Sequence, residues 1–591
     1  MTISADSLAE CDIIMKGGIT SGVVYPKAIL RMSRQYRFCS IGGTSAGAIA
    51  AVITAAAEHN RSGGGFAVID ALPDEVQRKL LTFFQPSPQF RGVFDFALMW
   101  LAGRRSAAIG KLAGAHWLPL LLGFVGNCAL FAVTASLAGY FAAMLLFVLA
   151  AVIGLAFWLY SVTVTTLRAL DSSDFGFCPG RTQPGATDPA LSDWMADKIE
   201  LAAGRMQQGG ARPASPLCFK DIWNEFSGAG DKPKRAIDLR MMTTNLSLRR
   251  PHALPDMDHN HYFKEDEFRR LFPDWIVDYM IAVSKEYREE NKTRPDDLRA
   301  QGYYRFPVGG DMPLVVAARM SLSFPILFTA IPLYRRDYTS RSDTETPNMQ
   351  RMLFSDGGLS SNFPIHFFDA LLPRRPTFGV SLEAFDEDAP NRRVRLPMKA
   401  LSGIWLDYEN IEGLVGFLFS LVSAAKDWQD RLQSTLPGYR ERIASIYLKN
   451  DEGGLNLDMD PAKIANLVEF GDRAGALMTG TSLSPDDKQT FDFEDHKWRR
   501  FLVAFARLEE TLQQTASSWY DSGQPMKEFV ETYMADPRSY RTSTPEWRRS
   551  VFERFDSVMA VAQKWNGTAL RDANPDNIPK PRTAMRITPV S

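Results

Sequence analysis

Residues 38–58 read FCSIGGTSAGAIAAVITAAAE, and this stretch indicates the class of fold. The apolar run Phe38–Ile41 predicts a short strand, and Ala48–Glu58, rich in alanine and isoleucine, predicts a helix. Between them Gly43–Gly47 has the sequence GTSAG, a GxSxG pattern. A strand, a tight turn and a helix in this order are typical of a nucleophile elbow, in which a serine sits on a strained turn that exposes its hydroxyl.

The glycines of this motif have a steric reason. Gly43 and Gly47 lack the Cβ atoms that would collide with the neighbouring strand and helix in such a turn. The turn also places Ser45 at a helix N-terminus, where backbone N–H groups and the helix dipole favour developing negative charge. An ordinary turn of small residues is the alternative interpretation.

A second glycine-rich loop lies closer to the N-terminus. The apolar run Cys11–Met15 predicts a strand, residues 16–22 read KGGITSG, and Val23–Met32 fits a helix. Two strand–loop–helix units so close together predict an α/β fold with a parallel sheet. The backbone N–H groups of the loop could hold an oxyanion. A nucleotide-phosphate loop is the competing interpretation, but neither GxGxxG nor GxxxxGK[ST] is present there.

A candidate base follows much later in the chain. A serine hydroxyl is a poor nucleophile unless a base takes its proton. Residues 355–358 read SDGG and follow the apolar run Met352–Phe354, so Asp356 would stand at a strand end in an open turn. Asp-Gly pairs are also common in ordinary turns, which is the structural alternative.

A long stretch of the chain carries no charged side chain. From Leu112 to Leu167, 56 residues (167 − 112 + 1) contain no Asp, Glu, Lys or Arg. About 20 apolar residues cross a bilayer, so the stretch fits two transmembrane helices near Trp117–Ser136 and Tyr140–Val162, joined by residues 137–139. A pair of buried core helices is the alternative.

The flanks of this stretch predict its orientation. Arg104, Arg105 and Lys111 precede it and Arg168 follows it, while the turn between the helices is uncharged. By the positive-inside rule both flanks lie on the cytoplasmic side. The first residues lack the basic and apolar regions of a secretory signal. We therefore expect a multi-pass membrane protein with two transmembrane helices and its catalytic domain on the cytoplasmic side.

Composition excludes some classes of protein. Among 591 residues, 67 Lys and Arg against 68 Asp and Glu give a net charge of −1, which argues against a nucleic-acid partner. Five scattered cysteines without a CxxC pair argue against a disulfide scaffold or a cysteine zinc site. The cluster of Asp256, Asp258, His259 and His261 could bind a metal, but no recognised ligand spacing is completed elsewhere, and a polar loop is the preferred interpretation.

Together these motifs, in this order, resemble the patatin-like phospholipase family. Residues 216–223, 243–245 and 317–325 also look like this family. The resemblance implies a Ser–Asp dyad without histidine, metal or organic cofactor, with Ser45 as nucleophile and Asp356 as base. It further assigns an oxyanion loop and a set of motif glycines: Gly17, Gly18 and Ile19 for the loop, and Gly22, Gly43, Gly47, Gly357 and Gly358 as motif glycines. In this chain Ile19 replaces the family's third glycine, and Ser21 replaces its basic residue.

The resemblance and the uncharged stretch together predict the organisation of the chain. We expect a patatin-like three-layer α/β/α domain with a mostly parallel central sheet, an inserted transmembrane helical hairpin and a helical C-terminal region. The expected segments are the two parts of the catalytic domain at 10–60 and 186–480, a helical approach to the membrane at 61–111, the hairpin at 112–168, the helical region at 485–574 and a tail at 575–591.

The expected activity follows from this set of residues. The resemblance implies a membrane-anchored serine acyl hydrolase, a phospholipase A or lysophospholipase, whose partners are the phospholipid membrane and its lipid substrate. A non-catalytic membrane scaffold with the same fold is one alternative. A histidine-dependent α/β-hydrolase that uses His366 is another. The sequence does not specify the lipid headgroup, the acyl chain or any protein partner.

Overall fold

The computed structural model describes most of the chain. The described residues are 8–18, 20–101, 104–115, 117–138, 140–223, 235–290, 301–336, 349–387, 390–397, 411, 417, 436, 438–449, 451–453, 456–457, 459–481, 491–521, 523, 525–539 and 541–565. The sequence pattern of residues 411–431 predicts a helix, which falls almost entirely outside these residues, and the predicted tail at 575–591 falls wholly outside them.

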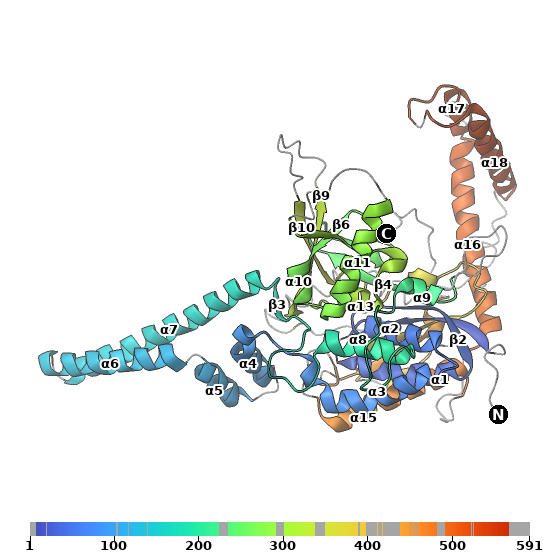
Figure 1. Cartoon of the computed structure of the whole chain (residues 1–591). Helices are drawn as coiled ribbons and strands as arrows, with labels where there is room; N and C mark the ends of the chain where they lie inside the picture. Colours follow the sequence, from blue (N-terminus) through green and yellow to red (C-terminus); the bar gives the residue numbers. More distant parts are fainter. Residues whose placement is uncertain are drawn as a thin grey trace.

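One large sheet forms the centre of the fold (Figure 1). Its eleven strands follow the order β12-β13-β11-β1-β2-β4-β10-β9-β6-β7, with β5 paired to β4. The strands are β1 Ala9–Met15, β2 Tyr36–Gly43, β4 Asp238–Asn245, β5 Arg250–Leu254, β6 His261–Lys264, β7 Tyr303–Arg305, β9 Ile331–Arg336, β10 Met349–Asp356, β11 Thr377–Ala384, β12 Val394–Arg395 and β13 Ile443–Leu448. A separate two-stranded sheet pairs β3 (Gly176–Cys178) with β8 (Ile326–Phe328).

The large sheet is mixed, so the prediction of a mostly parallel sheet is wrong. Strands β13, β11, β1, β2 and β4 run parallel to one another. From β4 onward every pairing is antiparallel. Connection length is one physical reason. Only residues 246–249 separate β4 from β5, and a parallel crossover needs a connection of roughly a dozen residues or more.

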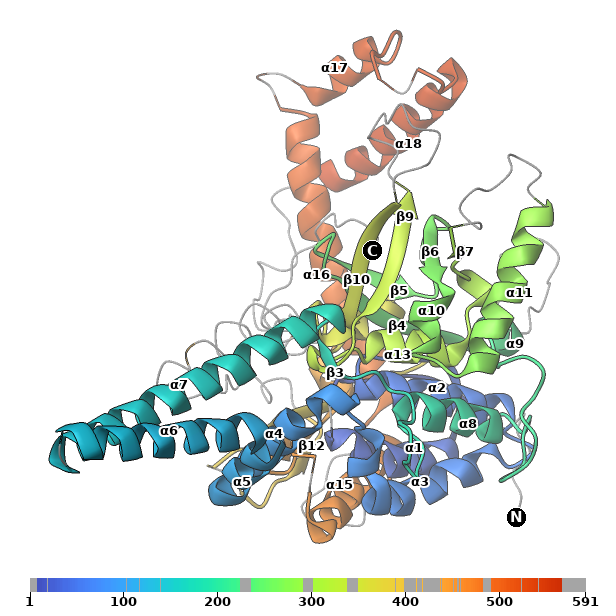
Figure 2. The same cartoon turned by 60° about the vertical axis from the view of Figure 1, so that its left-hand side comes forward.

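The helices gather mainly around the parallel half of the sheet. Figure 2 shows α1, α2, α3, α8 and α15 close together beside it. The helices of the main body are α1 Tyr25–Ser33, α2 Ala46–His59, α3 Gly65–Lys79, α8 Leu191–Ala202, α9 Phe219–Trp223, α10 Glu265–Arg269, α11 Asp274–Glu290, α13 Leu314–Ser321 and α15 Pro461–Thr479. The sequence pattern of residues 72–84 predicts one helix, but the structure has there the end of α3 followed by a short 3-10 turn, Leu81–Phe83.

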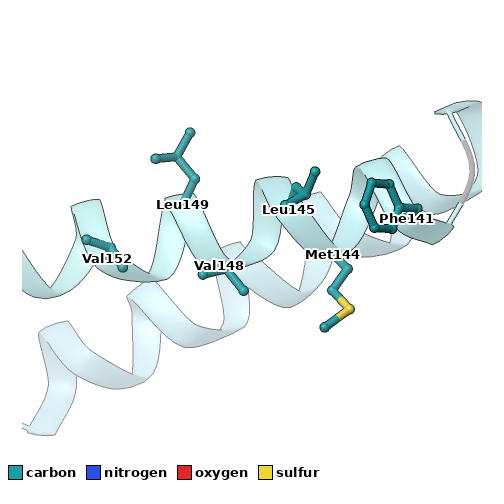
Figure 3. A pocket seen from close by; sticks show the side chains of 6 residues that line it. All are labelled: Phe141, Met144, Leu145, Val148, Leu149 and Val152. Carbon is teal, nitrogen blue, oxygen red and sulfur yellow. The ribbon is translucent and has the colours of Figure 1, made fainter.

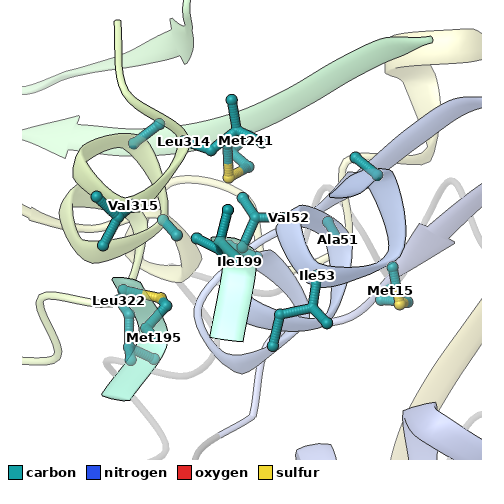
Figure 4. Close-up of a cluster of buried hydrophobic side chains, with 14 of the residues drawn as sticks. Met15, Ala51, Val52, Ile53, Met195, Ile199, Met241, Leu314, Val315 and Leu322 are labelled. Atoms are coloured by element: carbon teal, nitrogen blue, oxygen red, sulfur yellow. The ribbon is translucent and has the colours of Figure 1, made fainter. Parts of the chain in front are cut away.

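The main hydrophobic core surrounds α2. Side chains from β1, β4, α8 and α13 meet it there (Figure 4): Met15, Met241, Met195, Ile199, Leu314, Val315 and Leu322 lie near Ala51, Val52 and Ile53 of α2. The many alanines of α2 let neighbouring elements approach it closely on several sides. The residue just before this helix, Ser45, is therefore held on a rigid support.

Helix α15 packs with unusual closeness against the N-terminal helices. A Cβ atom at Gly471 would lie 1.9 Å from the carbonyl oxygen of Val24, and one at Gly475 would lie 2.8 Å from that of Ala28. Only glycine permits this approach of two backbones.

Two apolar helices project from the main body. They are α6 (Trp117–Ala138) and α7 (Tyr140–Ser172), which lie side by side and are preceded by α4 (Arg91–Leu101) and α5 (Arg105–Ala115) (Figures 1 and 2). Segments Pro119–Leu137 and Tyr140–Ser172 have mean hydropathies of 2.0 and 2.6, and both are long and apolar enough to cross a membrane. Helix α7 continues ten residues beyond the expected end at Val162, to Ser172.

These two helices are not core helices of this chain. In their most apolar windows the buried share is 0% for the first and 11% for the second. Side chains of α7 even line an apolar groove on the outside of the hairpin (Figure 3): Phe141, Met144, Leu145, Val148, Leu149 and Val152. Large contiguous apolar surfaces of this kind are rare on soluble monomers.

A helical arm follows the sheet. It contains α16 (Phe493–Trp519), α17 (Met526–Tyr533) and α18 (Pro545–Gln563), and it extends away from the main body (Figure 2). Its distal end has its own small core of Ala516, Trp519, Phe552, Met559 and Ala562.

A buried ionic cluster fastens this arm to the main body. Arg500 of α16 is 1% exposed, and its Nη2 lies 3.1 Å from Asp369 Oδ2. Arg442 Nη2 lies 2.6 Å from the other oxygen of the same carboxylate. One aspartate thus neutralises two buried guanidinium groups, and the removal of one partner from such a cluster is strongly destabilising.

Candidate active site

Ser45 occupies a strained turn between β2 and α2. Its backbone angles are φ 53° and ψ −127°, a conformation that a non-glycine residue rarely adopts. It immediately precedes Ala46, the first residue of α2. The strand, strained serine and helix match the geometry of a nucleophile elbow.

The two glycines of the GxSxG motif are sterically required. A Cβ at Gly43 would lie 2.4 Å from the carbonyl oxygen of Gly47, and a Cβ at Gly47 would lie 2.3 Å from that of Met15. In the neighbouring loop, a Cβ at Gly22 would lie 2.9 Å from the Cβ of Ala46. The turn can therefore pack against β1 and the glycine-rich loop only with these small residues.

The sheet register brings Ser45 and Asp356 to the same level. Gly43 pairs with Met241 in the parallel β2–β4 ladder; Ser45 follows two residues after this pair on one chain segment, and Thr243 follows two residues after it on the other. Asp356 pairs with Thr243 across the antiparallel β4–β10 ladder. One strand lies between the two predicted catalytic residues, which corresponds to a backbone separation of about 10 Å. Both side chains can therefore reach the space above β4.

Asp356 ends β10 and is held on several sides. Its Oδ1 accepts a hydrogen bond of 2.7 Å from the backbone N–H of Gly358. Its own carbonyl oxygen accepts one of 2.8 Å from the hydroxyl of Thr244. A Cβ at Gly357 would lie 2.0 Å from the carbonyl oxygen of Met242, which explains why glycine follows the aspartate. These contacts fix the carboxylate at the strand end.

The glycine-rich loop lies directly against Ser45. The carbonyl oxygen of Gly18 accepts hydrogen bonds of 3.1 Å from the Ser45 hydroxyl and 3.1 Å from the Ala46 N–H. The N–H of Gly17 donates to the carbonyl oxygen of Asn362 at 2.8 Å. Ile19, the third residue assigned to the oxyanion loop, lies outside the described residues.

In this conformation the candidate active site is closed to solvent. Ser45 and Asp356 are each 3% exposed. In a nucleophile elbow the N–H after the serine is an oxyanion donor, and here that donor, Ala46, is occupied by the Gly18 carbonyl. The loop is therefore not arranged to receive an ester carbonyl, and the oxyanion role of Gly17 and Gly18 stays a prediction.

The end of β1, which leads into this loop, is firmly anchored. Lys16 Nζ donates to the carbonyl oxygen of Leu382 at 2.9 Å and lies 2.9 Å from Glu383 Oε1. The Tyr25 hydroxyl donates to the carbonyl oxygen of Lys16, and burial raises the pKa of Tyr25 well above its ordinary value, so the hydroxyl stays protonated. These contacts hold the backbone at Lys16, immediately before the loop.

A pair of serines without a role in the sequence motifs contacts both predicted catalytic residues. Ser321 Oγ accepts a hydrogen bond of 3.3 Å from the Ser45 N–H. The Ser323 carbonyl oxygen accepts one of 3.0 Å from the Asp356 N–H and one of 2.8 Å from the Ser355 hydroxyl. These serines lie in residues 317–325, which the sequence marked only as similar to a family. The arginine at position 319, in an otherwise apolar helix, was the available signal.

His366 and His261, the histidines named in the alternative interpretations, have the following contacts. The Ser45 hydroxyl donates to Gly18 and not to an imidazole, while His366 lies in the short turn Ile365–Phe368 with its ring 5.1 Å from that of Phe367. His261 is buried, and its Nδ1 contacts the carbonyl oxygen of Asp258 at 3.1 Å. Across the ranges given above, no group of three or more His, Cys, Asp or Glu side chains is arranged to hold a metal ion.

Comparison with known proteins identifies the family. A family model described as patatin-like phospholipase matches residues 200–369, a range that includes Asp356 and the Ser321–Ser323 segment. The chain belongs to the patatin-like phospholipase family, a family of lipid acyl hydrolases.

Individual relatives add the following likenesses. The chain is 32% identical, over an alignment 665 positions long, to a protein named RpoH suppressor from Rhizobium meliloti (strain 1021), and the alignment covers 98% of each protein. It is 35% identical over 185 residues to the uncharacterized protein YqhO of Bacillus subtilis (strain 168), covering 31% of this chain and 50% of that one. The crystal structure of VipD from Legionella pneumophila aligns over 96% of this chain and 87% of VipD with 13% identity and a TM-score of 0.25, which is too low to carry an argument.

Proposed function

We propose that this protein is a membrane-anchored serine acyl hydrolase that releases fatty acids from phospholipids or lysophospholipids through a Ser45–Asp356 dyad. Membership of a family of lipid acyl hydrolases supports the reaction class. The observation that carries the proposal is the strained Ser45 at the head of α2, level with Asp356 across β4.

In the proposed reaction, Asp356 accepts the proton of the Ser45 hydroxyl while the oxygen attacks the ester carbonyl. The alcohol part of the lipid leaves with a proton, and an acyl group stays on Ser45. Water activated by the same carboxylate then hydrolyses this acyl-enzyme and frees the fatty acid. A tetrahedral oxyanion forms in both steps, and backbone N–H donors stabilise it.

The glycine-rich loop must change conformation for this reaction. The carbonyl of Gly18 now accepts from both the Ser45 hydroxyl and the Ala46 N–H. When this carbonyl turns away, the hydroxyl becomes available to Asp356 and the Ala46 N–H to the oxyanion. The glycines at 17 and 18 suit such a change, because glycine adopts backbone conformations that other residues do not.

We propose that α6 and α7 cross the membrane as a hairpin with both ends on the cytoplasmic side. A helix of 33 residues such as α7 extends about 50 Å, more than the roughly 30 Å of bilayer hydrocarbon. The basic residues Arg104, Arg105, Lys111 and Arg168 flank the hairpin and support this orientation. The hairpin would hold the catalytic domain, assigned to residues 10–60 and 186–480, against its lipid substrate. The three-layer arrangement and the other segment limits likewise stay predictions.

The decisive experiment on the dyad compares Ser45→Ala and Asp356→Asn with the parent. Fatty-acid release from phosphatidylcholine and lysophosphatidylcholine vesicles should fall to background in both variants. Only the parent should react rapidly with a fluorophosphonate probe. Ser33→Ala, which removes a buried serine at the end of α1, is the matched control and should keep activity. Substantial activity in Ser45→Ala would refute the mechanism, and a parent that never labels would favour a non-catalytic scaffold.

The membrane proposal has its own test. Alkaline carbonate extraction of membranes should leave the full chain in the pellet. Reagents that label cysteine from the outside should not reach a cysteine introduced at Asp95 in sealed cells, because α4 would lie on the cytoplasmic side. Release of the protein into the supernatant would reject the spanning hairpin without affecting the dyad.

A further inference from the structure

One short segment contacts the backbones of both predicted catalytic residues. It is Ser321–Ser323, at the end of α13, whose first hydroxyl accepts from the Ser45 N–H and whose last carbonyl accepts from the Asp356 N–H. Both serines of the segment are fully buried. The separation between nucleophile and base therefore depends on where these three residues lie.

A buried arginine holds this segment. Arg319 is fully buried, and its Nη1 donates to Ser323 Oγ at 2.7 Å. The Ser323 hydroxyl in turn donates to the carbonyl oxygen of Arg319 at 3.0 Å. The guanidinium also lies 4.9 Å from the centre of the Phe328 ring. Side chain and backbone of one residue thus close a ring of hydrogen bonds around Ser323.

The same guanidinium also contacts the root of the apolar hairpin, defined as residues 173–179, which follow α7. Its Nη2 donates to the carbonyl oxygens of Pro179 at 3.2 Å and Thr329 at 3.0 Å. These carbonyls follow the paired strands β3 and β8; three residues separate α7 from β3, and two residues separate Ser323 from β8. Arg319 therefore joins the chain leaving the hairpin to the chain that holds the dyad.

This junction has a strained backbone. Phe175 and Ile326 have φ values of 59° and 69°, which are outliers for a bulky and a β-branched residue, and the N–H of Ile326 donates to the carbonyl oxygen of Phe175 at 3.1 Å. Backbone strain of this kind persists only where the surroundings over-determine the conformation, and it concentrates at functional sites.

Burial of the charged Arg319 side chain costs free energy, which argues that this guanidinium has a specific role. Burial lowers the pKa of Arg319 to about 10. Its hydrogen-bond partners in the described part of the chain are hydroxyl and carbonyl oxygens, none of them a carboxylate. An apolar side chain of similar size would avoid this desolvation, but it could not join three separate segments.

We infer that Arg319 is a positioning residue, which fixes Ser321–Ser323, and through it the Ser45 and Asp356 backbones, against the root of the apolar hairpin. This inference rests on the proposed dyad. A displacement of about 1 Å between reacting groups can reduce turnover by about a hundredfold. Arg319 thus sets how well the base and nucleophile are aligned, without contacting substrate.

The test uses the full-length protein with the variant Arg319→Lys, which keeps the charge but loses the planar set of donors. Turnover of a phospholipid substrate should fall by between about tenfold and a hundredfold, with KM changed by less than about threefold. Fluorophosphonate labelling of Ser45 should slow by a similar factor. Circular dichroism defines a temperature at which every variant is folded.

The matched control is Arg61→Lys. Arg61 also donates to two backbone carbonyls, those of Ser33 at 2.8 Å and Tyr36 at 2.9 Å, but it lies beyond the far end of α2, about 20 Å along that helix from the elbow. This control should lower stability and leave turnover of the folded protein unchanged. A positioning role also requires that Arg319→Lys and Ser323→Ala are not additive in their effect on turnover.

Three results would overturn the inference. They are turnover and labelling of folded Arg319→Lys within about twofold of the parent, a loss no larger than that of Arg61→Lys, or additive losses with Ser323→Ala. If Arg319→Lys does not fold, Ser321→Ala and Ser323→Ala test the same segment, and normal turnover in both would refute it. Activity in Ser45→Ala would instead refute the dyad itself, so the two failures are distinguishable.

Discussion

Replacement of Gly47 by alanine gives a sharp test of the elbow geometry. The new Cβ would lie 2.3 Å from the carbonyl oxygen of Met15 and 2.9 Å from that of Lys16. Both atoms belong to the backbone, so no side-chain rotation relieves the contact. Ordinary contact begins at 3.4 Å, so α2 and β1 must separate locally by about 1.1 Å (3.4 − 2.3). A shift of this size at the head of α2 moves Ser45 relative to Asp356.

The expected result of Gly47→Ala is a loss of about a hundredfold in turnover and a destabilisation of about 1–3 kcal/mol from overpacking. Fatty-acid release from vesicles and thermal unfolding measure the two effects separately. Gly110→Ala in α5 is the matched control, because a Cβ there meets nothing within 4 Å. Turnover of Gly47→Ala at half the parent value or more, with unchanged stability, would refute the steric reasoning.

Three further predictions concern stability. Gly471→Ala should lower the melting temperature by several degrees, because its Cβ would lie 1.9 Å from the Val24 carbonyl oxygen and such overpacking costs about 1–3 kcal/mol. An unchanged melting temperature would contradict the close packing of α15. Asp369→Ala should destabilise the protein by about 3–5 kcal/mol and expose α16 to protease, because Arg500 would lose the carboxylate that neutralises it. Equal protease resistance in variant and parent would count against this ionic cluster as the attachment of α16. Burial and nearby positive groups lower the pKa of His252 from 6.5 to about 4. Between these pH values only the unfolded chain binds the proton, so the free energy of unfolding falls as the pH falls, by about 2 kcal/mol from pH 7 to pH 5. Denaturant unfolding of His252→Gln should lack this part of the pH dependence.

The parallel half of the fold could be predicted more fully than the antiparallel half, in which the apolar run Met352–Phe354 indicates β10 but not its antiparallel pairing. Strands β1 and β2 and helix α2 have clear apolar runs bounded by glycines, so their places follow from local pattern. Strand β6 is the four residues HYFK, too short and too polar to stand out. The antiparallel strands are also held by pairings between distant parts of the chain, which local patterns do not encode.

For the candidate site, sequence supplied the residues but not their arrangement. Motifs and a resemblance identify Ser45 and Asp356, whereas their relative position depends on the pairings Gly43–Met241 and Asp356–Thr243. The contact of the Gly18 carbonyl with Ser45 depends on loop conformation, which glycines leave open. Ser323 acts through its backbone carbonyl, and no side-chain pattern reports such a role.

The position of β10 in the chain order has a consequence for biosynthesis. The ribosome completes the Ser45 turn and both apolar helices within the first 172 residues, whereas Asp356 is added after about three fifths of the 591-residue chain. On the proposed mechanism, a nascent chain that inserts its hairpin into a bilayer contains Ser45 but not yet its proton acceptor, Asp356. On that mechanism, the chain would have no hydrolytic activity toward the membrane that receives it until translation has passed β10.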